Sequence, residues 1–406
     1  MIESAQVSLS LPPVTPTHWI NYSNTGTRVI LWPGAIDALA DEVSKLGCTR
    51  VMVTAGRNTR QTQLFQKVMK ALGDLVVTVF EEVVEHSSTV AVTKGAAIAR
   101  AEKIDGFVAV GGGSSSDTAK GIAIMVAEGG KIEDHASSFV PPDKFYPTEL
   151  HQPKLPVIAV PTTASAAEVT PGLGIRAEDG RKLLFWDVKL ACRLIVLDPQ
   201  ANIEVPASLM AATAMNGFAH CAEGLYSRMR NPISEGLALQ GIRILSEAIP
   251  AMVKDPASVD HRAGVLAGAH ISGMVISNAR VGIHHAVCHC LGALGGLGHG
   301  VSNSIMLPHA LAYNLDVANS QLARMADAMG ADIRNLTPEQ AATCAIEAVR
   351  ELQSASKVPT RLRDTGLDKA LLPAIAEHTL SDRGMFFNPR RTNDAAPILA
   401  MLEAAW

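Results

Sequence analysis

Residues 106–127 read GFVAVGGGSSSDTAKGIAIMVA, and this stretch carries the pattern that the first half of the chain repeats. The apolar run Gly106–Val110 predicts a short buried strand, and the three glycines that follow end it. Residues Asp117–Ala127 then show the apolar spacing of a helix. A buried strand, a tight turn and a helix are the repeating unit of a parallel sheet that helices cover on both faces.

The same alternation extends from this stretch in both directions, up to Leu197. Short apolar runs predict further strands, and amphipathic runs between them predict helices. The predicted strands are 27–33, 50–54, 75–80, 156–160 and 193–197, and helices are predicted over 36–46, over 89–103 and over a segment that ends at Leu72. We therefore predict an α/β domain over residues 1–198, in which the Pro-, Ser- and Thr-rich residues 1–26 form an extended arm.

Strand patterns nearly vanish after Asp198-Pro199. Helical spacing dominates the rest of the chain, in the segments 207–228, 232–254, 262–293, 321–329, 337–352 and 371–380. We therefore predict an all-α domain over residues 199–406, with the boundary between the two domains near 198–203.

Composition narrows the classes of function. The chain has 406 residues, 48% hydrophobic and 18% charged, with a net charge of −4. This charge argues against nucleic acid as a partner, because phosphate binding needs a basic face. Six scattered cysteines predict reduced thiols, and no signal peptide or membrane-length apolar run is found. We expect a cytoplasmic enzyme with a small-molecule substrate, assembled as a homodimer or larger homo-oligomer.

The glycine turn after the strand 106–110 is a candidate phosphate site. Gly111, Gly112 and Gly113 let backbone approach a ligand closely, and a helix that starts there offers free N–H groups to a pyrophosphate. The serines 114–116 add hydroxyl donors. The turn matches neither the GxGxxG fingerprint nor a Walker A motif. An ordinary tight turn with serine caps is the alternative interpretation.

A second hydroxyl-rich loop, VPTTASAAEVTP at 160–171, also follows a predicted strand. It offers the hydroxyls of Thr162, Thr163, Ser165 and Thr170. Loops at the carboxyl ends of parallel strands face one crevice, where ligands of open α/β sheets bind. Ordinary turn and cap chemistry is again the alternative.

Histidines concentrate in VGIHHAVCHCLGALGGLGHGVSNSIMLPH, residues 281–309, which hold five of the thirteen in the chain. Asn216 and His220 lie four positions apart, as do His285 and His289, so each pair shares one face of a helix. His220, His285 and His299 are able to converge as ligands of a divalent metal. The alternatives are a metal-free catalytic pocket and a packed helical core.

These motifs, in this order, resemble the iron-containing (group III) alcohol dehydrogenases. The resemblance rests on GGGSSSDTAKG, VPTTASAAEVTP, the Asp198-Pro199 boundary and HHAVCHCLGALGGLGHGVSNSIMLPHALAYN, and it runs from about Thr27 onward. It implies a dehydroquinate synthase-like architecture, with an α/β dinucleotide-binding domain, an all-α domain and an active site in the cleft between them. By this resemblance the cofactor contacts Gly111, Gly112, Gly113, Ser114, Ser115, Asp117, Lys120, Thr162, Thr163, Ser165 and Lys182.

One position departs from the metal-binding members of the family, which carry Asp where this chain has Asn216. A neutral amide oxygen is a weak ligand for a transition metal. MNGFAHCAEGLYS, the double histidine in IHHAVCHCLGA, and Asn388-Pro389-Arg390 resemble the maleylacetate reductase branch. The long segment 134–154 and the loop 164–168 instead differ from that branch, and the long segment resembles the metal-dependent dehydrogenases.

The resemblance to the reductase branch implies NADH- or NADPH-dependent hydride addition to an enone, without a metal. His285 and His289 would act on the substrate, while His220, His299 and Asn216 would shape the pocket. Cations for a dicarboxylate substrate would come from Arg228, Arg230, Arg390 or Arg391. With Arg57 after the strand that ends at Thr54, the cofactor site would accept the 2′-phosphate of NADPH. The alternatives are a dehydrogenase in which His220, His285 and His299 hold Fe²⁺ or Zn²⁺, and a non-catalytic nucleotide-binding protein.

Overall fold

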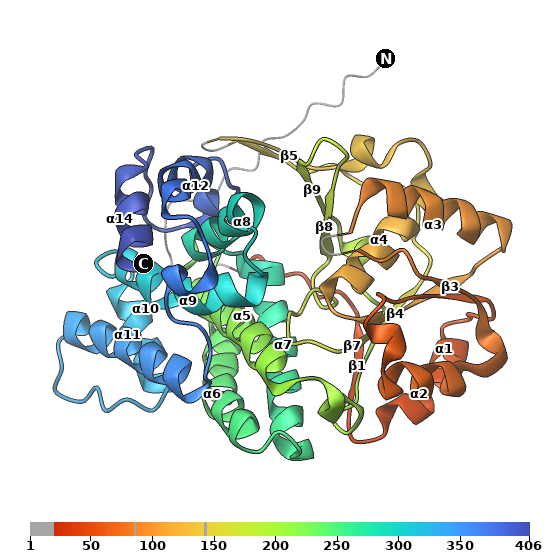
Figure 1. Cartoon of the computed structure of the whole chain (residues 1–406), viewed down its shortest axis with the longest axis horizontal. Helices are drawn as coiled ribbons and strands as arrows, with labels where there is room; N and C mark the ends of the chain where they lie inside the picture. The colour runs from red at the N-terminus through yellow and green to blue at the C-terminus, as the bar shows by residue number, and fades with distance from the viewer. Residues whose placement is uncertain (1–19, 85–86, 142–143) are drawn as a thin grey trace.

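The computed structural model describes residues 20–84, 87–141 and 144–406. The chain forms two halves (Figure 1): a sheet with its helices, and a group of packed helices. The predicted arm falls mainly on residues 1–19, which lie outside the described part. The last strand of the sheet ends at Leu197, and the first long helix of the other half begins at Ala207.

Six parallel strands form the main sheet, in the order β1-β10-β7-β4-β2-β3. They are β1 (Arg28–Leu31), β2 (Val51–Thr54), β3 (Val76–Phe80), β4 (Gly106–Gly111), β7 (Val157–Pro161) and β10 (Leu194–Leu197). Each lies within two residues of a predicted strand. The expected parallel α/β sheet is therefore confirmed.

Alternate residues of the strands face opposite layers of helices, as the period of two requires. Val108 and Val110 of β4 join the cluster that holds the buried residues of α1 (Leu39–Lys45) and α2 (Gln63–Leu72). Phe107 and Ala109 join the cluster with α3 (Thr89–Ala101) and α4 (Gly113–Glu128). Because both faces are covered, the strands read as continuous apolar runs without polar alternation.

Two antiparallel hairpins interrupt this pattern, and the sequence analysis did not predict either. They are β5 (Ser138–Val140) with β6 (Lys144–Tyr146), and β8 (Gly172–Arg176) with β9 (Lys182–Trp186). The first lies in the long segment 134–154. The second packs against α4 and continues the loop that follows β7. Both are short. The strands of the first hairpin bury one residue and those of the second bury five, three in β8 and two in β9, so no long apolar run marks either.

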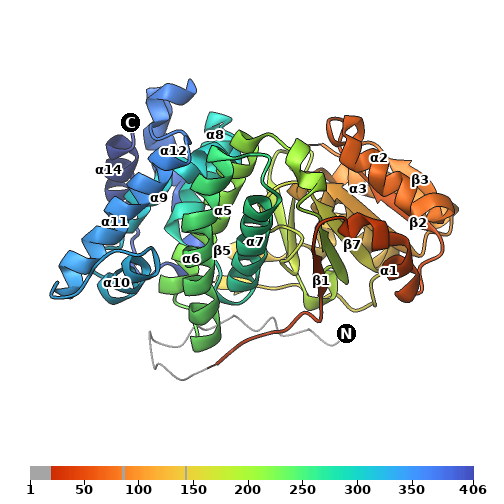
Figure 2. The ribbon, with the colours of Figure 1, turned by 90° about the horizontal axis from the view of Figure 1, so that it is seen from below.

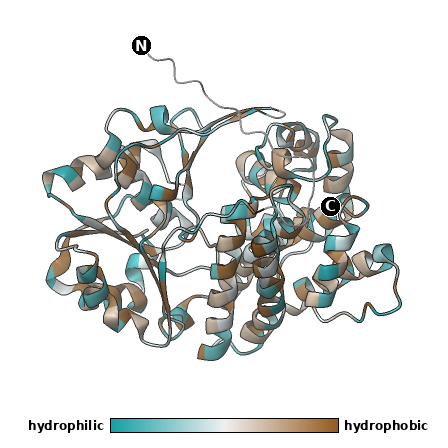
Figure 3. Cartoon of the chain, turned by 180° about the vertical axis from the view of Figure 1, so that it is seen from behind, coloured by the Kyte–Doolittle hydropathy of each residue, from teal (hydrophilic) through white to brown (hydrophobic). Residues whose placement is uncertain are grey.

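The helical half contains α5 (Ala207–Tyr226), α6 (Pro232–Lys254), α7 (Val259–Ala279), α8 (Ile283–Gly295), α9 (His299–Tyr313), α10 (Asn319–Ala328), α11 (Pro338–Ala355), α12 (Leu372–Thr379), α13 (Gly384–Phe387) and α14 (Ala396–Ala404). In Figure 3 these helices carry hydrophobic and hydrophilic stretches side by side, as amphipathic helices do. An all-α second half is confirmed.

The single helix predicted over 262–293 is wrong. The chain breaks between α7 and α8, where Arg280 adopts a left-handed φ of 68°. A Cβ on Gly282 would lie 2.8 Å from the Oδ1 atom of Asn388 and 3.1 Å from an Oε1 atom of Glu223. Glycine at this position therefore lets two side chains approach the start of α8, which a continuous helix would not allow.

Residues 20–27 run from β1 along the helical half (Figure 2). The backbone N–H of Ser23 donates to Asn278, and the amide of Asn231 donates to the carbonyl of Asn21. This part of the predicted arm therefore binds the second half of the molecule to the first strand of the sheet.

One helix of the described residues, α6, is long and apolar enough to cross a membrane by those two measures alone. It packs between α5 and α7 and buries residues such as Ile242, Leu245 and Ile249. These contacts are those of a core helix in a helical domain.

Candidate active site

The two candidate cofactor loops lie side by side at the carboxyl ends of β4 and β7. These strands are neighbours, with Gly111 paired to Pro161. The N–H of Thr162 donates to the carbonyl of Gly111 at 2.9 Å. The two loops therefore meet at one edge of the sheet.

The glycine turn is closely packed, which explains its composition. Gly111 has a φ of 136°, and a Cβ on it would lie 2.6 Å from Oγ of Ser115. A Cβ on Gly112 would lie 3.4 Å from Oγ1 of Thr163. Helix α4 begins at Gly113, so its first N–H groups point toward this edge and offer the partial positive charge that suits a phosphate.

Most side chains that the resemblance assigns to the cofactor border this edge. Those of Ser114, Asp117, Thr162, Thr163 and Ser165 are half-buried, that of Ser115 is buried, and that of Lys182 is exposed on β9. The Oδ2 atom of Asp117 accepts a bond from the N–H of Gly174, and burial raises the pKa of its carboxyl to about 6.

Lys120, also assigned to the cofactor by the resemblance, has partners within the protein. Its side chain is completely buried, and its ammonium donates to the carbonyls of Ala167, Thr170 and Gly172 at 2.8, 2.7 and 3.2 Å. All three donors of the ammonium are engaged. Lys120 therefore fixes the loop after β7 to α4, and the cofactor contact that the resemblance implies for it stays a prediction.

The histidines of α5, α8 and α9 converge on one pocket of the helical half. The ring centroids of His220 and His285 lie 4.8 Å apart and are stacked. Those of His285 and His299 lie 5.9 Å apart, and His289 stacks on His299 at 5.7 Å. Asn216 completes the cluster through its Oδ1 atom, 2.9 Å from Nε2 of His285. The convergence expected from helical spacing is therefore present.

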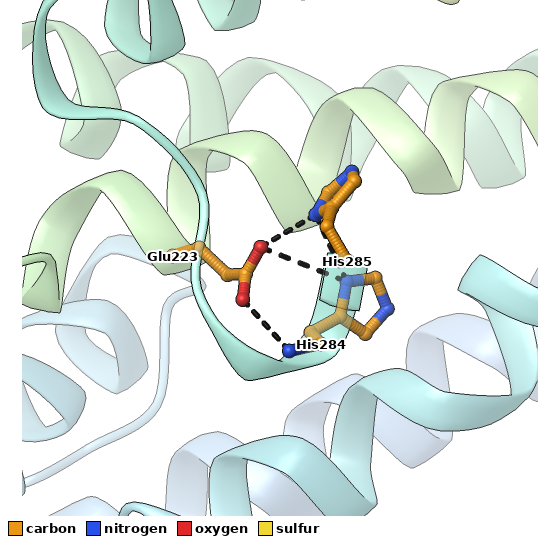
Figure 4. A group of neighbouring side chains, drawn as sticks. All are labelled: Glu223, His284 and His285. Atoms are coloured by element: carbon orange, nitrogen blue, oxygen red, sulfur yellow. Dashed lines mark hydrogen bonds and ion pairs between the residues drawn. The ribbon is translucent and has the colours of Figure 1, made fainter. Parts of the chain in front are cut away.

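The carboxylate of Glu223 contacts the Nδ1 side of the His285 ring (Figure 4). Its Oε2 atom lies 2.5 Å from Nδ1 of His285, and its Oε1 atom accepts the backbone N–H of His284 at 2.9 Å. Burial raises the pKa of Glu223 to about 7 and lowers that of His285, so burial favours the neutral form of each group. Nδ1 of His284 lies 3.2 Å from Nδ1 of His285, and Nε2 of His284 donates to the carbonyl of Asn303.

Two more histidines are held in the same way. Nδ1 of His220 donates to Oγ of Ser272 at 3.4 Å, because that hydroxyl already donates to the carbonyl of Ala269. Nδ1 of His289 lies 2.8 Å from a carboxylate oxygen of Asp382. In each case the partner contacts Nδ1, so Nε2 is the ring nitrogen that this partner does not engage.

The histidines of the cluster differ in how much of each is exposed to solvent. His220 and His285 are 4% and 3% exposed, whereas the side chain of His289 retains 26%. Burial lowers the pKa of His220, His285 and His299 well below the usual value, so these imidazoles favour the neutral form. His289 is the one of the four that combines access to solvent with a carboxylate partner.

Sequence reasoning missed the residues that position the histidines: Glu223, Ser272, His284 and Asp382. Two of them carried a signal: Glu223, because positions 216, 220 and 223 share one helical face, and His284, because it belongs to the double histidine. Asp382 lies 93 positions from His289, and nothing in the sequence links them.

The four arginines proposed for a dicarboxylate all have partners within the protein. Arg228 and Arg391 donate to the carbonyl of Phe386. Arg230 pairs with Glu235, and Arg390 pairs with Asp316 and donates to the carbonyl of Tyr313. These bonds tie segments of the helical half together, so none of the four guanidinium groups is without a partner.

Family comparisons agree with this geometry. Residues 26–199 match the iron-containing alcohol dehydrogenase model, and residues 210–406 match the C-terminal model of the Fe-containing alcohol dehydrogenase family. The chain belongs to the iron-containing alcohol dehydrogenase family. It is therefore an oxidoreductase, from a family that uses NAD(H) and often iron.

Individual relatives divide between two activities. The chain is 31% identical to a 1,3-propanediol dehydrogenase of Klebsiella pneumoniae over 89% of this chain and 93% of the relative. It is 32% identical to a maleylacetate reductase of Sphingobium indicum over 75% and 77% of the two chains. The solved structure of a 1,3-propanediol oxidoreductase is 30% identical, covers 93% of this chain and 98% of its own, and superposes with a TM-score of 0.87.

The donor set fits the family's metal incompletely. By the resemblance, the donors would be the imidazoles of His220, His285 and His299 and the amide oxygen of Asn216. Among the described residues, the group whose possible ligand atoms lie within 4.8 Å of one another is instead Glu223, His284 and His285. The nearest carboxylates, Glu223 and Asp382, are hydrogen-bonded to Nδ1 atoms on the far side of the imidazoles. A divalent ion held by the donors that the resemblance implies would therefore have no anionic ligand, which weakens binding relative to a set with one carboxylate.

Proposed function

We propose that this oxidoreductase is a maleylacetate reductase-type enzyme. It would use NADH or NADPH to add hydride to an enone of an oxo dicarboxylate, in the catabolism of aromatic compounds, without a metal. One observation carries the proposal: Oδ1 of Asn216 faces Nε2 of His285 at 2.9 Å. We also expect the homodimeric or larger state and the cytoplasmic location predicted from the sequence.

The orientation of Asn216 is set by its other contact. Its Nδ2 atom donates to the carbonyl of Ser165 at 3.4 Å, so Oδ1 is the atom directed at His285. Oδ1 of Asn216 and an unprotonated Nε2 of His285 would both be acceptors, and at 2.9 Å they would repel each other unless a proton or a cation lay between them. A proton on Nε2 of His285 meets this requirement, and it makes that nitrogen a donor.

The reaction then proceeds with the residues at hand. A bound nicotinamide would supply a hydride to the carbon of the double bond farther from the ketone. The π electron pair of that double bond would then shift, and the negative charge would develop on the ketone oxygen as an enolate. The N–H of His285 stabilises that oxygen. His289 delivers a proton to the neighbouring carbon and regains one from solvent, with Asp382 holding its Nδ1. His220 and His299 enclose the site.

A second candidate function is a metal-dependent alcohol dehydrogenase. It is favoured by the anchoring of His220 by Ser272 and of His285 by Glu223, since metal-ligating histidines commonly donate Nδ1–H to such partners. Here His220, His285 and His299 would hold Fe²⁺ or Zn²⁺, which polarises a carbonyl oxygen when bound. The missing carboxylate argues against it.

Metal analysis and a chelator test separate the two. We expect the purified protein to oxidise NADH with maleylacetate at the same rate before and after chelation. Asn216→Asp restores an anionic ligand and should retain Fe²⁺ or Zn²⁺ that the parent does not. Loss of activity on chelation, with recovery on added metal, would favour the dehydrogenase. Cofactor binding without turnover of any enone, aldehyde or alcohol would contradict both functions.

A further inference from the structure

Arg383, next to the histidine cluster in the chain, has a guanidinium for which the described residues supply a ring contact and the neighbouring charge of Asp382 but no hydrogen bond. It follows Asp382, whose carboxylate holds Nδ1 of His289, and it precedes α13. Its backbone is therefore one residue away from the group that orients the proposed proton donor. Neither motif analysis nor the resemblance singled it out.

The guanidinium of Arg383 makes no hydrogen bond or ion pair with any described residue. It lies 5.2 Å from the ring centroid of Phe145, a buried residue of the β5–β6 hairpin. Burial lowers the pKa of Arg383, which indicates a cost of holding the charge among protein atoms. Arg228 and Arg391 stack near Phe386, which lies three residues after Arg383. They differ from Arg383 because both donate a hydrogen bond to a backbone carbonyl. Arg383 alone of these three lacks an acceptor.

A second unpaired guanidinium lies nearby, on Arg280. It stacks on Trp186 at 3.6 Å, and its Nη1 atom is buried without a hydrogen-bond partner. The segments that carry the two arginines touch, since a Cβ on Gly384 would lie 2.5 Å from the carbonyl oxygen of Gly282. The charge of Arg383 helps to lower the pKa of Arg280 and of Lys182. These cations repel one another, and Asp382, the nearest carboxylate, already binds His289.

We propose that Arg383 binds a carboxylate of the substrate beside the His289–Asp382 pair, with Arg280 reinforcing the positive potential there. A guanidinium offers a planar set of donors that a carboxylate matches with two bonds. The ligand is assigned to the substrate because Arg383 directly follows Asp382, the residue that holds Nδ1 of His289. The loops assigned to the pyrophosphate lie at the edge of the sheet.

This assignment deepens and rests on the proposed function, because it names which residue recognises the acid group. It also gives the long segment 134–154 a role, since Phe145 of that segment lies against the guanidinium and limits where its side chain can point. The substrate class that fits is a carbonyl compound with a carboxylate some bonds away from the reacting centre.

The test compares Arg383→Gln and Arg383→Lys with Arg361→Gln, a control at an exposed arginine of the same half of the molecule. Each variant is assayed with maleylacetate and with its neutral diester. We expect Arg383→Gln to lower kcat/KM for the acid by roughly 10- to 100-fold, the loss typical of a charged hydrogen bond, with little change for the ester. Arg383→Lys should recover part of the loss, and the KM for NADH and NADPH should not move.

Equal losses for acid and ester would overturn the proposal, because they indicate a structural role. So would an acid-selective loss in Arg361→Gln with none in Arg383→Gln, or a rise in the KM of either cofactor. If the parent protein reduces neither compound, the proposed function fails and binding of succinate by calorimetry decides the site separately. Succinate binding that Arg383→Gln abolishes would uphold the carboxylate site, and its absence from the parent protein would overturn it.

Discussion

The glycine turn at the end of β4 and the histidine cluster of α8 are both candidate binding sites. The turn would bind a ligand through its backbone, whereas the cluster would bind one through side chains. At the turn, Gly111–Gly113 remove side chains so that backbone N–H groups can meet a ligand. In the cluster, His220, His285 and His289 are each held by a partner on the Nδ1 atom. A change at the turn should therefore act mainly on cofactor affinity, whereas a change in the cluster should act on the rate of the reaction.

The largest effect is expected in the cluster. His289→Asn removes the proposed proton donor while leaving an amide that can still bond Asp382. We expect kcat to fall by about 10²- to 10⁴-fold, the usual contribution of a general acid, with the KM for cofactor unchanged. Steady-state kinetics measure this, and His378→Asn, at an exposed histidine, is the control. A normal rate would mean that the proton comes from another group.

A second expectation concerns Glu168, a buried carboxyl in the loop after β7. Burial raises its pKa from 4.5 to about 7, and the nearby charges are Lys120 and Asp117. The folded chain therefore favours the protonated form, so this contribution to stability is complete below about pH 4.5 and is lost as the pH rises through 7. Glu168→Gln should be more stable than the parent at pH 8 by up to about 3 kcal/mol, and equally stable near pH 4.5.

Denaturant unfolding at the two pH values measures the difference. The exposed Glu247→Gln serves as the control and should show no such dependence. A difference between Glu168→Gln and the parent that is the same at both pH values would contradict the role of ionisation.

The turn should respond differently from the cluster. Gly111→Ala places a Cβ at a φ of 136°, 2.6 Å from Oγ of Ser115, so the turn must shift. We expect the KM for NADH to rise about tenfold, with a smaller change in kcat. Gly129→Ala is the matched control, because Gly129 also has a positive φ but no neighbour within 4 Å. An equal rise in KM for both variants would indicate general strain and not a local effect on the cofactor.

The smallest effect is expected outside the turn, at the exposed Arg57 beyond the end of β2. Arg57→Asp replaces a cation with an anion where a 2′-phosphate would be met. The KM for NADPH should rise on the order of tenfold more than that for NADH. Equal changes for the two cofactors would refute the idea that Arg57 tolerates the extra phosphate, and the exposed Arg243→Asp controls for net charge.

The difference between the two sites also explains what the sequence could predict. Strands such as β4 were predicted because a sheet buried on both faces requires unbroken apolar runs. The meeting of His220, His285 and His299 followed from helical spacing. The break at Arg280 was missed because arginine is not a helix breaker and its φ is set by packing. Asp382 and Arg383 were missed because their partners, His289 and Phe145, lie far away in the sequence.

The packing at Gly282 bears on the order in which the protein can be assembled during synthesis. The N–H of Ile283, at the start of α8, donates to the side chain of Asn388, 105 positions later. The main sheet has all its strands once Leu197 has left the ribosome. The double histidine cannot take its final position until residues 384–388 have also emerged. In a nascent chain, the edge of the sheet with the proposed cofactor loops would therefore form before the proposed catalytic histidines are in place. Incomplete copies would then be inactive.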